Sequence, residues 1–227
     1  MKKTIVLSLG GSLIVPKEID AKFLTKFIAT IRSYVKKGYR FAIICGGGGV
    51  ARQYQKAASK IARLDNEALD WIGIEATKLN AYFLMRLFDK DSESAVIYDP
   101  SKPLSFRKPI AIASGWKPGW STDYDAILIA RQLGADTVIN MSNITQVFSA
   151  DPKKDRSAKP LSTLTWSAYR KISGDKWVAG MNLPFDPIAA KEAQSLGIQV
   201  YVIGKDLANF RNIIEGKKWK GTVISNG

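Results

Sequence analysis

Predominantly apolar runs alternate with amphipathic stretches along most of the chain. The runs at 5–9 and 40–45 are short and nearly continuous, which predicts strands buried on both faces of a sheet. Between them, at 18–37, large apolar residues recur every three or four positions, as on one face of a helix. Gly38 follows this stripe directly, and we expect it to end the helix.

The same alternation continues towards the C-terminus. We predict helices from about 50, at 66–89, from Thr122 as N-cap, at 187–196 and at 206–215, and strands at 95–98, 109–113, 136–141, 199–203 and 222–224. The polar, proline-bearing stretch 150–163 is expected to be a loop. This order predicts an α/β fold, a three-layer αβα sandwich with a mainly parallel central sheet. We treat residues 1–227 as one domain.

Four polar or glycine-bearing loops follow predicted strands. They lie at 10–12, 46–49, 114–122 and 142–149. Binding loops of mainly parallel sheets lie beyond the carboxyl ends of the strands. We therefore expect these four loops to share one edge of the sheet.

The stretch AIICGGGGVARQY at 42–54 carries four consecutive glycines. Successive main-chain N–H groups in such a loop can cradle an anion, and a helix that begins just after it adds its positive dipole end. Arg52 can bind phosphate oxygens through two parallel hydrogen bonds. The pattern favours a phosphoryl site, although a plain turn is the alternative. It matches neither the Walker A loop nor the G-x-G-x-x-G dinucleotide fingerprint.

Charge and composition narrow the partners. Lys and Arg number 34 against 20 Asp and Glu, a formal net charge of +14, which favours anionic ligands or simply a solvated basic surface. The basic residues are scattered, so no specific nucleic acid is expected. Cys45 is the single cysteine, which excludes an internal disulfide and fits a reducing compartment. Gly10-Gly11 interrupts the first apolar run, which argues against a secretory signal, and no run approaches the length of a membrane span. We expect a cytoplasmic protein with no membrane partner.

Taken in order, these loops give a resemblance to the amino acid kinase superfamily, and within it to the archaeal-type uridylate (UMP) kinases. The resemblance runs from residue 3 to about 224. Its motifs are LGGS at 9–12, GGG at 46–48 with Arg52, DWIGI at 70–74 with Asn80, PGWSTD at 118–123, SN at 142–143 with FSADPKKD at 148–155, and FDPIAAK at 185–191.

The resemblance implies transfer of the γ-phosphate of ATP to UMP, giving UDP and ADP with Mg²⁺, in pyrimidine nucleotide biosynthesis. It implies no dedicated set of metal-ligating side chains. It also implies a homo-oligomer, commonly a hexamer. The part at about 1–120 would carry the UMP side and the oligomer contacts, and the part at about 121–227 the ATP side.

The resemblance also assigns residues to the ATP side. These are Gly10, Gly11, Gly48, Arg52, Ser142, Asn143, Phe148 and Asp151. On their residue types alone, Phe148 would more often be a core aromatic and Asp151 part of a plain turn.

A second set is assigned to UMP. These are Gly47, Asp70, Trp116, Lys117, Pro118, Gly119, Trp120, Ser121 and Thr122. Asp70 is implied to bind the UMP nucleoside, and its alternative is a helix-surface carboxylate. Trp116, Trp120 and Trp177 suit packing or the rim of the site, with base stacking by the first two left open.

Arg52, Asp123 and Asp186 are the candidate catalytic residues. Arg52 would hold phosphate between the two substrates. Asp123 would organise Mg²⁺ and the transferred group, or else complement the dipole of a helix as a first-turn carboxylate. Asp186 would lie near the phosphates, or else begin a helix before Pro187.

The chain departs from the family pattern at two places. Many members carry a lysine two residues before the first glycines, where this chain has Ser8. The family's Asn-Val-Asp-Gly-Val turn is NITQV at 143–147. These changes leave two alternatives open: a non-catalytic nucleotide- or anion-binding or storage protein, and a sister kinase of another small phosphate or acid. The absence of histidine argues against the relatives that use one at the acceptor, isopentenyl phosphate kinase and fosfomycin kinase.

Overall fold

A central seven-stranded sheet organises the protein. The computed structural model describes residues 4–174 and 183–227. The strands are β1 (Thr4–Leu9), β2 (Arg40–Cys45), β3 (Ile110–Ala113), β4 (Thr137–Met141), β7 (Thr163–Thr165), β8 (Gln199–Ile203) and β9 (Thr222–Ser225). Their order in the sheet is β3-β2-β1-β4-β8-β9-β7. A separate two-stranded ladder pairs β5 (Val147–Phe148) with β6 (Pro160–Leu161).

The strands on which the candidate loops follow are parallel and end level with one another. Leu9 of β1 pairs with Cys45 of β2 and with Met141 of β4, and Met141 pairs with Ile203 of β8. The exceptions to the parallel order are β9, which runs antiparallel to β8, and β7, which runs parallel to β9. The loops after β1, β2, β3 and β4 therefore lie along one edge of the sheet, as the sequence predicts.

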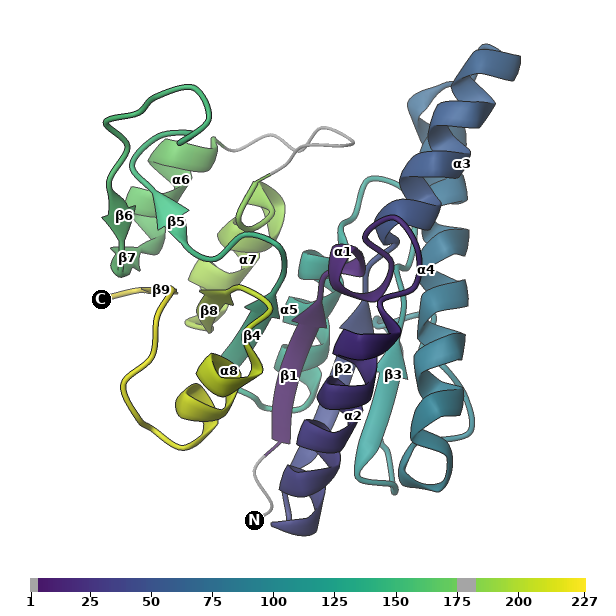
Figure 1. The fold of residues 1–227 in the computed structure, drawn as a ribbon. Coiled ribbons are helices and arrows are strands. Elements are labelled where there is room, and N and C mark those ends of the chain that lie inside the picture. The colour runs from purple at the N-terminus through teal and green to yellow at the C-terminus, as the bar shows by residue number, and fades with distance from the viewer. Residues whose placement is uncertain (1–3, 175–182) are drawn as a thin grey trace.

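Helices cover both faces of the sheet, so the predicted three-layer αβα sandwich is confirmed (Figure 1). On one face lie α2 (Ala21–Lys36), α4 (Asn66–Phe88) and α8 (Leu207–Ile214). On the other face lie α5 (Thr122–Gln132), α6 (Trp166–Ser173) and α7 (Pro187–Leu196). The remaining helices are α1 (Gly11–Ile14), α3 (Gly48–Ile61) and the 3-10 turn η1 (Asp89–Asp91).

Alternation of side chains along β1 explains its continuous apolar run. Ile5, Leu7 and Leu9 pack into the core under α2 and α4, whereas Val6 packs into the core under α5. A strand between two helical layers buries both of its faces, so each position favours an apolar residue. Ser8 is the buried polar residue of β1, only 2% exposed, whereas the polar Thr4 at the start of the strand is partly exposed.

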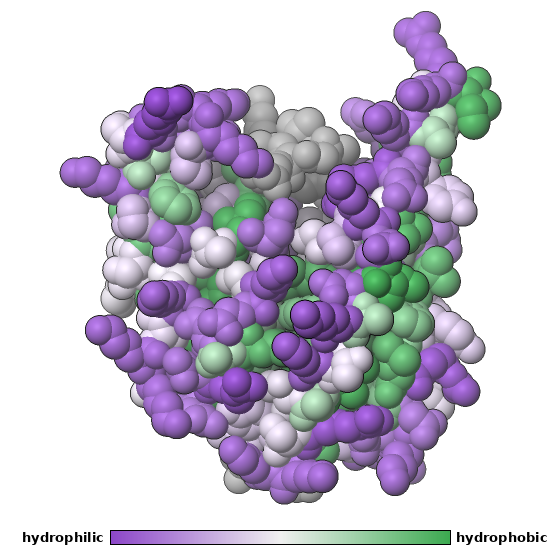
Figure 2. All heavy atoms as spheres, in the orientation of Figure 1, coloured by the Kyte–Doolittle hydropathy of each residue, from purple (hydrophilic) through white to green (hydrophobic). Residues whose placement is uncertain are grey.

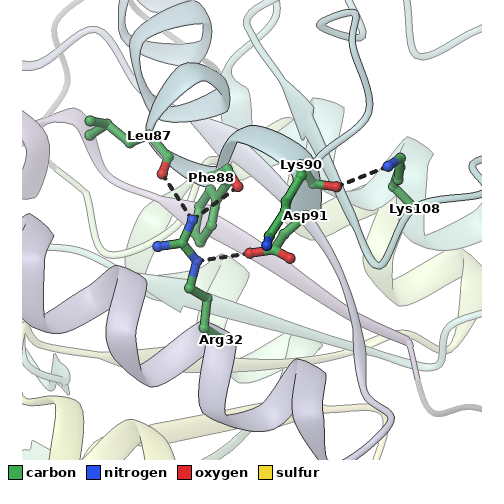
Figure 3. Close-up of polar contacts among 6 residues, drawn as sticks. All are labelled: Arg32, Leu87, Phe88, Lys90, Asp91 and Lys108. Carbon is green, nitrogen blue, oxygen red and sulfur yellow. Dashed lines mark hydrogen bonds and ion pairs between the residues drawn. The ribbon is translucent and has the colours of Figure 1, made fainter.

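One arginine joins two helices at the edge opposite the candidate loops (Figure 3). Arg32 of α2 donates to the Asp91 carboxylate at 2.8 Å and to the carbonyl oxygens of Leu87 and Phe88 at 3.3 and 3.1 Å. The last carbonyls of a helix lack intrahelical partners, and a cation there also complements the helix dipole. This contact fixes the C-terminal end of α4 against α2.

Two predicted boundaries are corrected by capping. The helix predicted at 18–37 is α2, and it begins at Ala21, because the Asp20 carboxylate accepts the Phe23 N–H at 2.9 Å and caps the helix. Ile19, which lies in the predicted apolar stripe, precedes the helix and is 51% exposed. The cap of α5 is Ser121, not Thr122, since its hydroxyl accepts the Tyr124 N–H at 3.2 Å.

Two further expectations are wrong in part. The stretch 95–98 forms no strand, and only Ile97 makes an isolated parallel bridge, to Ala113. The expected loop at 150–163 contains β6, and it leads into β7 and α6, which the apolar pattern did not predict. In the described parts of the chain, no helix combines the length and apolarity needed to cross a bilayer.

Candidate active site

A cavity of about 390 Å³ opens at the carboxyl edge of the sheet, between α3, α4 and the loops that follow β1 and β3. Nine of the residues predicted for substrate binding line it: Gly11, Gly47, Gly48, Arg52, Asp70, Trp120, Ser121, Thr122 and Asn143. These residues come from five separate segments of the chain. The structure thus brings most of the predicted UMP side and part of the predicted ATP side to one hollow.

The glycines of two loops interlock at the base of this cavity. A Cβ atom at Gly48 would overlap the Gly11 carbonyl, and one at Gly46 would lie 2.6 Å from the Gly11 nitrogen. Gly48 also has a φ of +63°, where a side chain is strained. Bare backbone is therefore needed for packing between the loops as well as for any approach of a phosphate. Part of the main chain at these helix starts is already engaged, because the Gly49 N–H of α3 donates to the Val15 carbonyl at 2.6 Å and the Leu13 N–H of α1 donates to the Gly10 carbonyl at 2.9 Å. An anion here would use the remaining first-turn N–H groups.

Buried polar residues of α4 hold these loops, and the sequence analysis assigned them no role. Asn80, 3% exposed, donates to the carbonyl oxygens of Gly46 at 2.8 Å and Gly47 at 3.1 Å. Thr77 accepts the Gly115 N–H at 2.8 Å. The signal that could have revealed them is a polar residue at a core position of an otherwise apolar helix face.

Arg52 extends from the first turns of α3 along the cavity wall. Its guanidinium donates to the Pro16 carbonyl at 3.1 Å, and the neighbouring Gln53 donates to the Lys17 carbonyl at 3.2 Å. Both side chains tether α3 to the segment after α1. Arg52 differs from Gln53 in carrying a positive charge and in lining the cavity.

Asp70 connects α4 to the loop after β3. Its carboxylate accepts the Gly119 N–H at 3.0 Å, and Gly119 has a φ of +80° that suits glycine. The predicted helix-surface alternative is therefore incomplete, because this carboxylate faces the cavity and positions a loop.

Aromatic rings of that loop and of the start of α5 lie in contact with one another, tilted. Trp120 lies 6.1 Å from Trp116 and 4.1 Å from Tyr124 between ring centroids. The Lys117 ammonium lies 4.0 Å from the centre of the Trp116 ring. Of these two tryptophans, Trp120 lines the cavity. Trp177 lies outside the described residues.

Asp123 is held by Ser8 and by the main chain of Asp186. Its Oδ1 accepts the Ser8 hydroxyl at 3.0 Å, and its Oδ2 accepts the Asp186 N–H at 3.2 Å. Burial of the carboxyl group, followed by the nearby Asp186 carboxylate, raises the pKa of Asp123 to about 7. Ser8, far from Asp123 in the sequence, therefore lies directly beside this carboxylate in the fold.

Asp186 is the N-cap of α7, as its structural alternative predicted. Its Oδ1 accepts the Ala189 N–H at 2.6 Å, and Pro187 occupies the first turn. Its Oδ2 is buried and has no hydrogen-bond partner among the residues that the structure describes. Burial raises the pKa of Asp186 above its usual range.

A third carboxylate, Asp125, lies close to this pair and was missed by sequence reasoning. It is fully buried, and within the described ranges no donor completes a hydrogen bond to either oxygen. Burial raises its pKa to about 8, while the Trp116 main-chain amide opposes part of the rise. Asp125 is therefore mostly protonated at neutral pH, and the predicted pattern of α5 gave no sign of it.

The remaining predicted ATP residues lie outside the cavity. The Gly10 N–H is bound by the Met141 carbonyl at 2.8 Å, and the Ser142 hydroxyl accepts the Ile144 N–H at 3.1 Å in a local turn. Phe148 is half-buried in β5, not a core aromatic. Asp151 is exposed and accepts the Lys153 N–H at 2.9 Å, so its turn is present. These residues continue the same edge of the sheet beyond β4.

An amide cradle, a cation and buried carboxylates at the carboxyl edge of a parallel sheet are suited to one kind of chemistry. Transfer of a phosphoryl group needs positioning and charge stabilisation, with little covalent work by the protein. The fold and this site therefore define a phosphotransferase class of protein.

Comparison with known proteins assigns the family. The sequence profile of the amino acid kinase family matches residues 3–204, and the chain belongs to that family. A protein called uridylate kinase from Methanocorpusculum labreanum is 33% identical over 226 residues, covering 98% of this chain and 95% of its own length. One of the same name from Thermococcus onnurineus is 35% identical, covering 97% and 98%.

Solved structures agree with this assignment. The crystal structure of uridylate kinase from Archaeoglobus fulgidus superposes with a TM-score of 0.83 at 33% identity, covering 99% of this chain and all of the other. The UMP kinase from Bacillus anthracis superposes with a TM-score of 0.77 at 21% identity, covering 99% and 96%, and shows the shared fold.

Proposed function

We propose that this protein is a nucleoside monophosphate kinase that transfers the γ-phosphoryl group of ATP to UMP, giving UDP and ADP. Relatives called uridylate kinase match nearly the whole chain at 33–35% identity. ATP is the co-substrate that the kinase family implies. UMP is proposed as the acceptor because these relatives are called uridylate kinases.

The observation that carries the proposal is the meeting of Arg52, Asp70 and the glycine loops in one cavity. In the proposed arrangement, Gly47 and Arg52 bind the UMP phosphate, and Asp70 with the loop 116–122 binds the nucleoside. The two substrates then meet over the interlocked glycines.

ATP would lie with its phosphates at Gly10, Gly11 and Gly48 and its nucleoside along Ser142, Asn143, Phe148 and Asp151. The part at about 1–120 then serves mainly the acceptor, and the part at about 121–227 mainly ATP. This division follows the edge of the sheet from β2 to β4.

The chemistry needs no general base, because a phosphate acceptor already carries an anionic oxygen. That oxygen attacks the γ-phosphorus of ATP, and the bond to the β-phosphate oxygen breaks as ADP leaves. Arg52 and the loop N–H groups stabilise charge on the oxygens of the transferred group. Ser8 and the Asp186 N–H hold the Asp123 carboxylate in place. Asp123 in turn would position the transferred phosphate on the side of the site next to α7.

The residues present also fit Mg²⁺, which would neutralise phosphate charge. This ion usually takes one or two carboxylates together with substrate phosphates and water. Asp186 offers a buried carboxylate oxygen without a partner in the described part of the chain, and Asp123 lies beside it. The described residues hold no cluster of three or more ligating side chains, so the substrate phosphates and water would supply the other ligands. We propose Asp123 and Asp186 as its protein ligands.

We also propose that the protein works as a homo-oligomer, a hexamer by its resemblance to the family. Large apolar side chains are exposed along the α3 and α4 pair, including Tyr54 at 66%, Ile61 at 85% and Leu79 at 59%. Figure 1 shows this pair extending beyond the sheet, where a second chain could cover it.

The test of the site is Arg52→Ala compared with Gln53→Ala. Both variants remove one tether between α3 and the segment after α1. Only Arg52→Ala removes a cation from the cavity, so it should lower kcat/KM at least about a hundredfold, as loss of a transition-state charge contact does. Gln53→Ala should stay within a fewfold of the wild type. An equal loss in both variants would mean that Arg52 only anchors α3.

A further inference from the structure

A second hollow, of about 720 Å³, runs between α2 and α8, and it shares no lining residue with the catalytic cavity. Both helices lie on the face that is turned to the viewer in Figure 1, and Figure 2 shows hydrophilic residues gathered over them. Lys22 and Lys26 of α2 line one wall, and Lys205 and Arg211 line the other. We call this hollow the α2–α8 groove.

Within the part of the chain that the structure describes, the four cations of the α2–α8 groove form no ion pair. None of the ion pairs found in the described ranges involves any of them. Lys22 and Lys26 are four residues apart on one helix, a spacing at which like charges repel each other. An anion between the two walls would relieve this repulsion.

Two carboxylates also line the groove, but each caps its own helix. Asp20 accepts the Phe23 N–H at 2.9 Å, and Asp206 accepts the Ala208 N–H at 2.8 Å. Neither forms an ion pair with a groove lysine or arginine within the described ranges. Four cations less two carboxylates leave the groove with a formal charge of +2.

We propose that the α2–α8 groove binds a small polyphosphate anion, either inorganic or carried by a nucleoside. Lysine and arginine bind phosphoryl oxygens through charge-assisted hydrogen bonds, and several cations in one groove favour several phosphoryl groups. The volume exceeds the need of a single phosphate. Phe23, 8% exposed, and Leu207 add apolar surface beside the cations, which suits a base or ribose.

The groove lies close to the catalytic loops, so a test must separate the two sites. The Asp20 N–H is bound by the carbonyl of Ile14, at the end of α1. Gly204, next to Lys205, packs closely on Thr145 in the loop after β4. A Cβ atom added at Gly204 would lie 2.9 Å from the methyl carbon of Thr145. The proposal itself does not depend on which acceptor the kinase uses.

Alanine methyl groups provide that separation. Ala29 and Ala208 line the groove, and Ala51 lines the catalytic cavity. NMR spectra of methyl-labelled alanines in the whole protein, titrated with inorganic tripolyphosphate and separately with CTP, report both sites at once. We expect saturable shifts of Ala29 and Ala208. Tighter binding of CTP would assign the groove to nucleotides, and equal binding to inorganic polyphosphate.

The decisive comparison uses Lys26→Gln with Arg211→Gln. This pair should weaken the binding seen at Ala29 and Ala208 at least about tenfold, because two charge-assisted contacts are lost. The shifts of Ala51 should not change, which also shows that the variant is folded. The matched control, Lys36→Gln with Lys60→Gln, removes two exposed lysines elsewhere and should alter the affinity less than twofold. Absence of shifts at Ala29 and Ala208 in the wild type, or an equal loss in the control, would overturn the proposal.

Discussion

At the scale of a single residue, Ser8 opposes part of the rise that burial and the Asp186 charge cause in the pKa of Asp123. Its hydroxyl donates to the Asp123 carboxylate at 3.0 Å, which favours the ionised form, while burial raises the pKa of Asp123 to about 7. If ionised Asp123 orders the transferred phosphate, turnover falls as the pH drops through the pKa that Asp123 has in the loaded site, which bound Mg²⁺ would lower. Ser8→Ala should move this acidic limb upwards by up to about one unit, because the bond to the charged form is lost. Ser8→Lys should move it downwards.

The measurement is the pH profile of kcat at saturating ATP and UMP for the three proteins. A comparison among variants cancels the titration of the substrates themselves. Superimposable acidic limbs would show that the charge of Asp123 does not limit turnover.

Asp125 should make the stability of the protein depend on pH. Its folded pKa of about 8 lies far above that of an unfolded aspartate, so the folded state binds the extra proton. Stability is therefore full below the unfolded pKa near 4 and declines as the pH rises towards 8. Asp125→Asn removes this decline, and we expect it to gain about 3–4 kcal/mol on the wild type between pH 5 and pH 8.

Urea unfolding at the two pH values measures this difference. Glu18→Gln, which neutralises an exposed carboxylate, is the matched control and should show no such gain. A wild type and Asp125→Asn with parallel pH dependence would mean that Asp125 is ionised or hydrated in solution.

At the scale of elements, α4 is the frame of the acceptor side. Asp70, Thr77 and Asn80 are seven and three residues apart, which places them along one side of the helix. They hold the Gly119 amide, the Gly115 amide and the carbonyls of the glycine loop, respectively. One helix thereby sets the spacing of the two loops that follow the paired strands β2 and β3.

Asp70→Asn tests this role of α4 together with the nucleoside contact. The loss of the anionic acceptor should raise the KM for UMP about tenfold or more, since hydrogen bonds to charged groups contribute roughly 1.5–3 kcal/mol. The KM for ATP should change less than twofold. Steady-state kinetics with each substrate varied in turn measures both, and Glu67→Gln in the first turn of α4 is the control. Equal shifts for the two substrates would assign Asp70 a structural role only.

The sequence predicts elements well where burial dictates the pattern. The strands at 4–9 and 40–45 lie between two helical layers, so each is a nearly continuous apolar run. The stretch 163–173 was not predicted, because β7 is a three-residue strand at the edge of the sheet and α6 is short. Short, partly exposed elements carry little periodicity.

Site residues were predictable from loop chemistry but not from tertiary partners. The glycines and Arg52 lie close together in the sequence, so the local pattern alone predicts an anion site. The core position of Asn80 on α4 indicates a buried contact, but its partners, the carbonyls of Gly46 and Gly47, lie far away in the sequence. The burial of Asp125 likewise depends on which segments pack against it. Asp186 illustrates both cases. Its N-cap role follows from the local sequence, whereas the burial of its unpartnered Oδ2 depends on tertiary packing.

At the scale of the whole molecule, the exposed apolar side chains of α3 and α4 predict an assembly. Light scattering at micromolar concentration should give a mass several times that of one chain, and six times if the hexamer is correct. Leu79→Lys with Tyr82→Lys, which places two charges on that surface, should lower the mass, because a buried unpaired charge is unfavourable at an interface. A wild-type mass equal to one chain would contradict the proposed oligomer.

The central claim is that the whole edge of the sheet, from the glycine loops to the turn after β4, performs phosphoryl transfer to UMP. The most direct test is release of ADP from Mg-ATP with UMP, CMP, dUMP, AMP and isopentenyl phosphate offered in parallel. The account predicts turnover with UMP well above that with every other acceptor. Binding of ATP or UMP without ADP release from any acceptor would contradict it, and would mean that the protein binds nucleotides on a kinase fold without catalysing transfer.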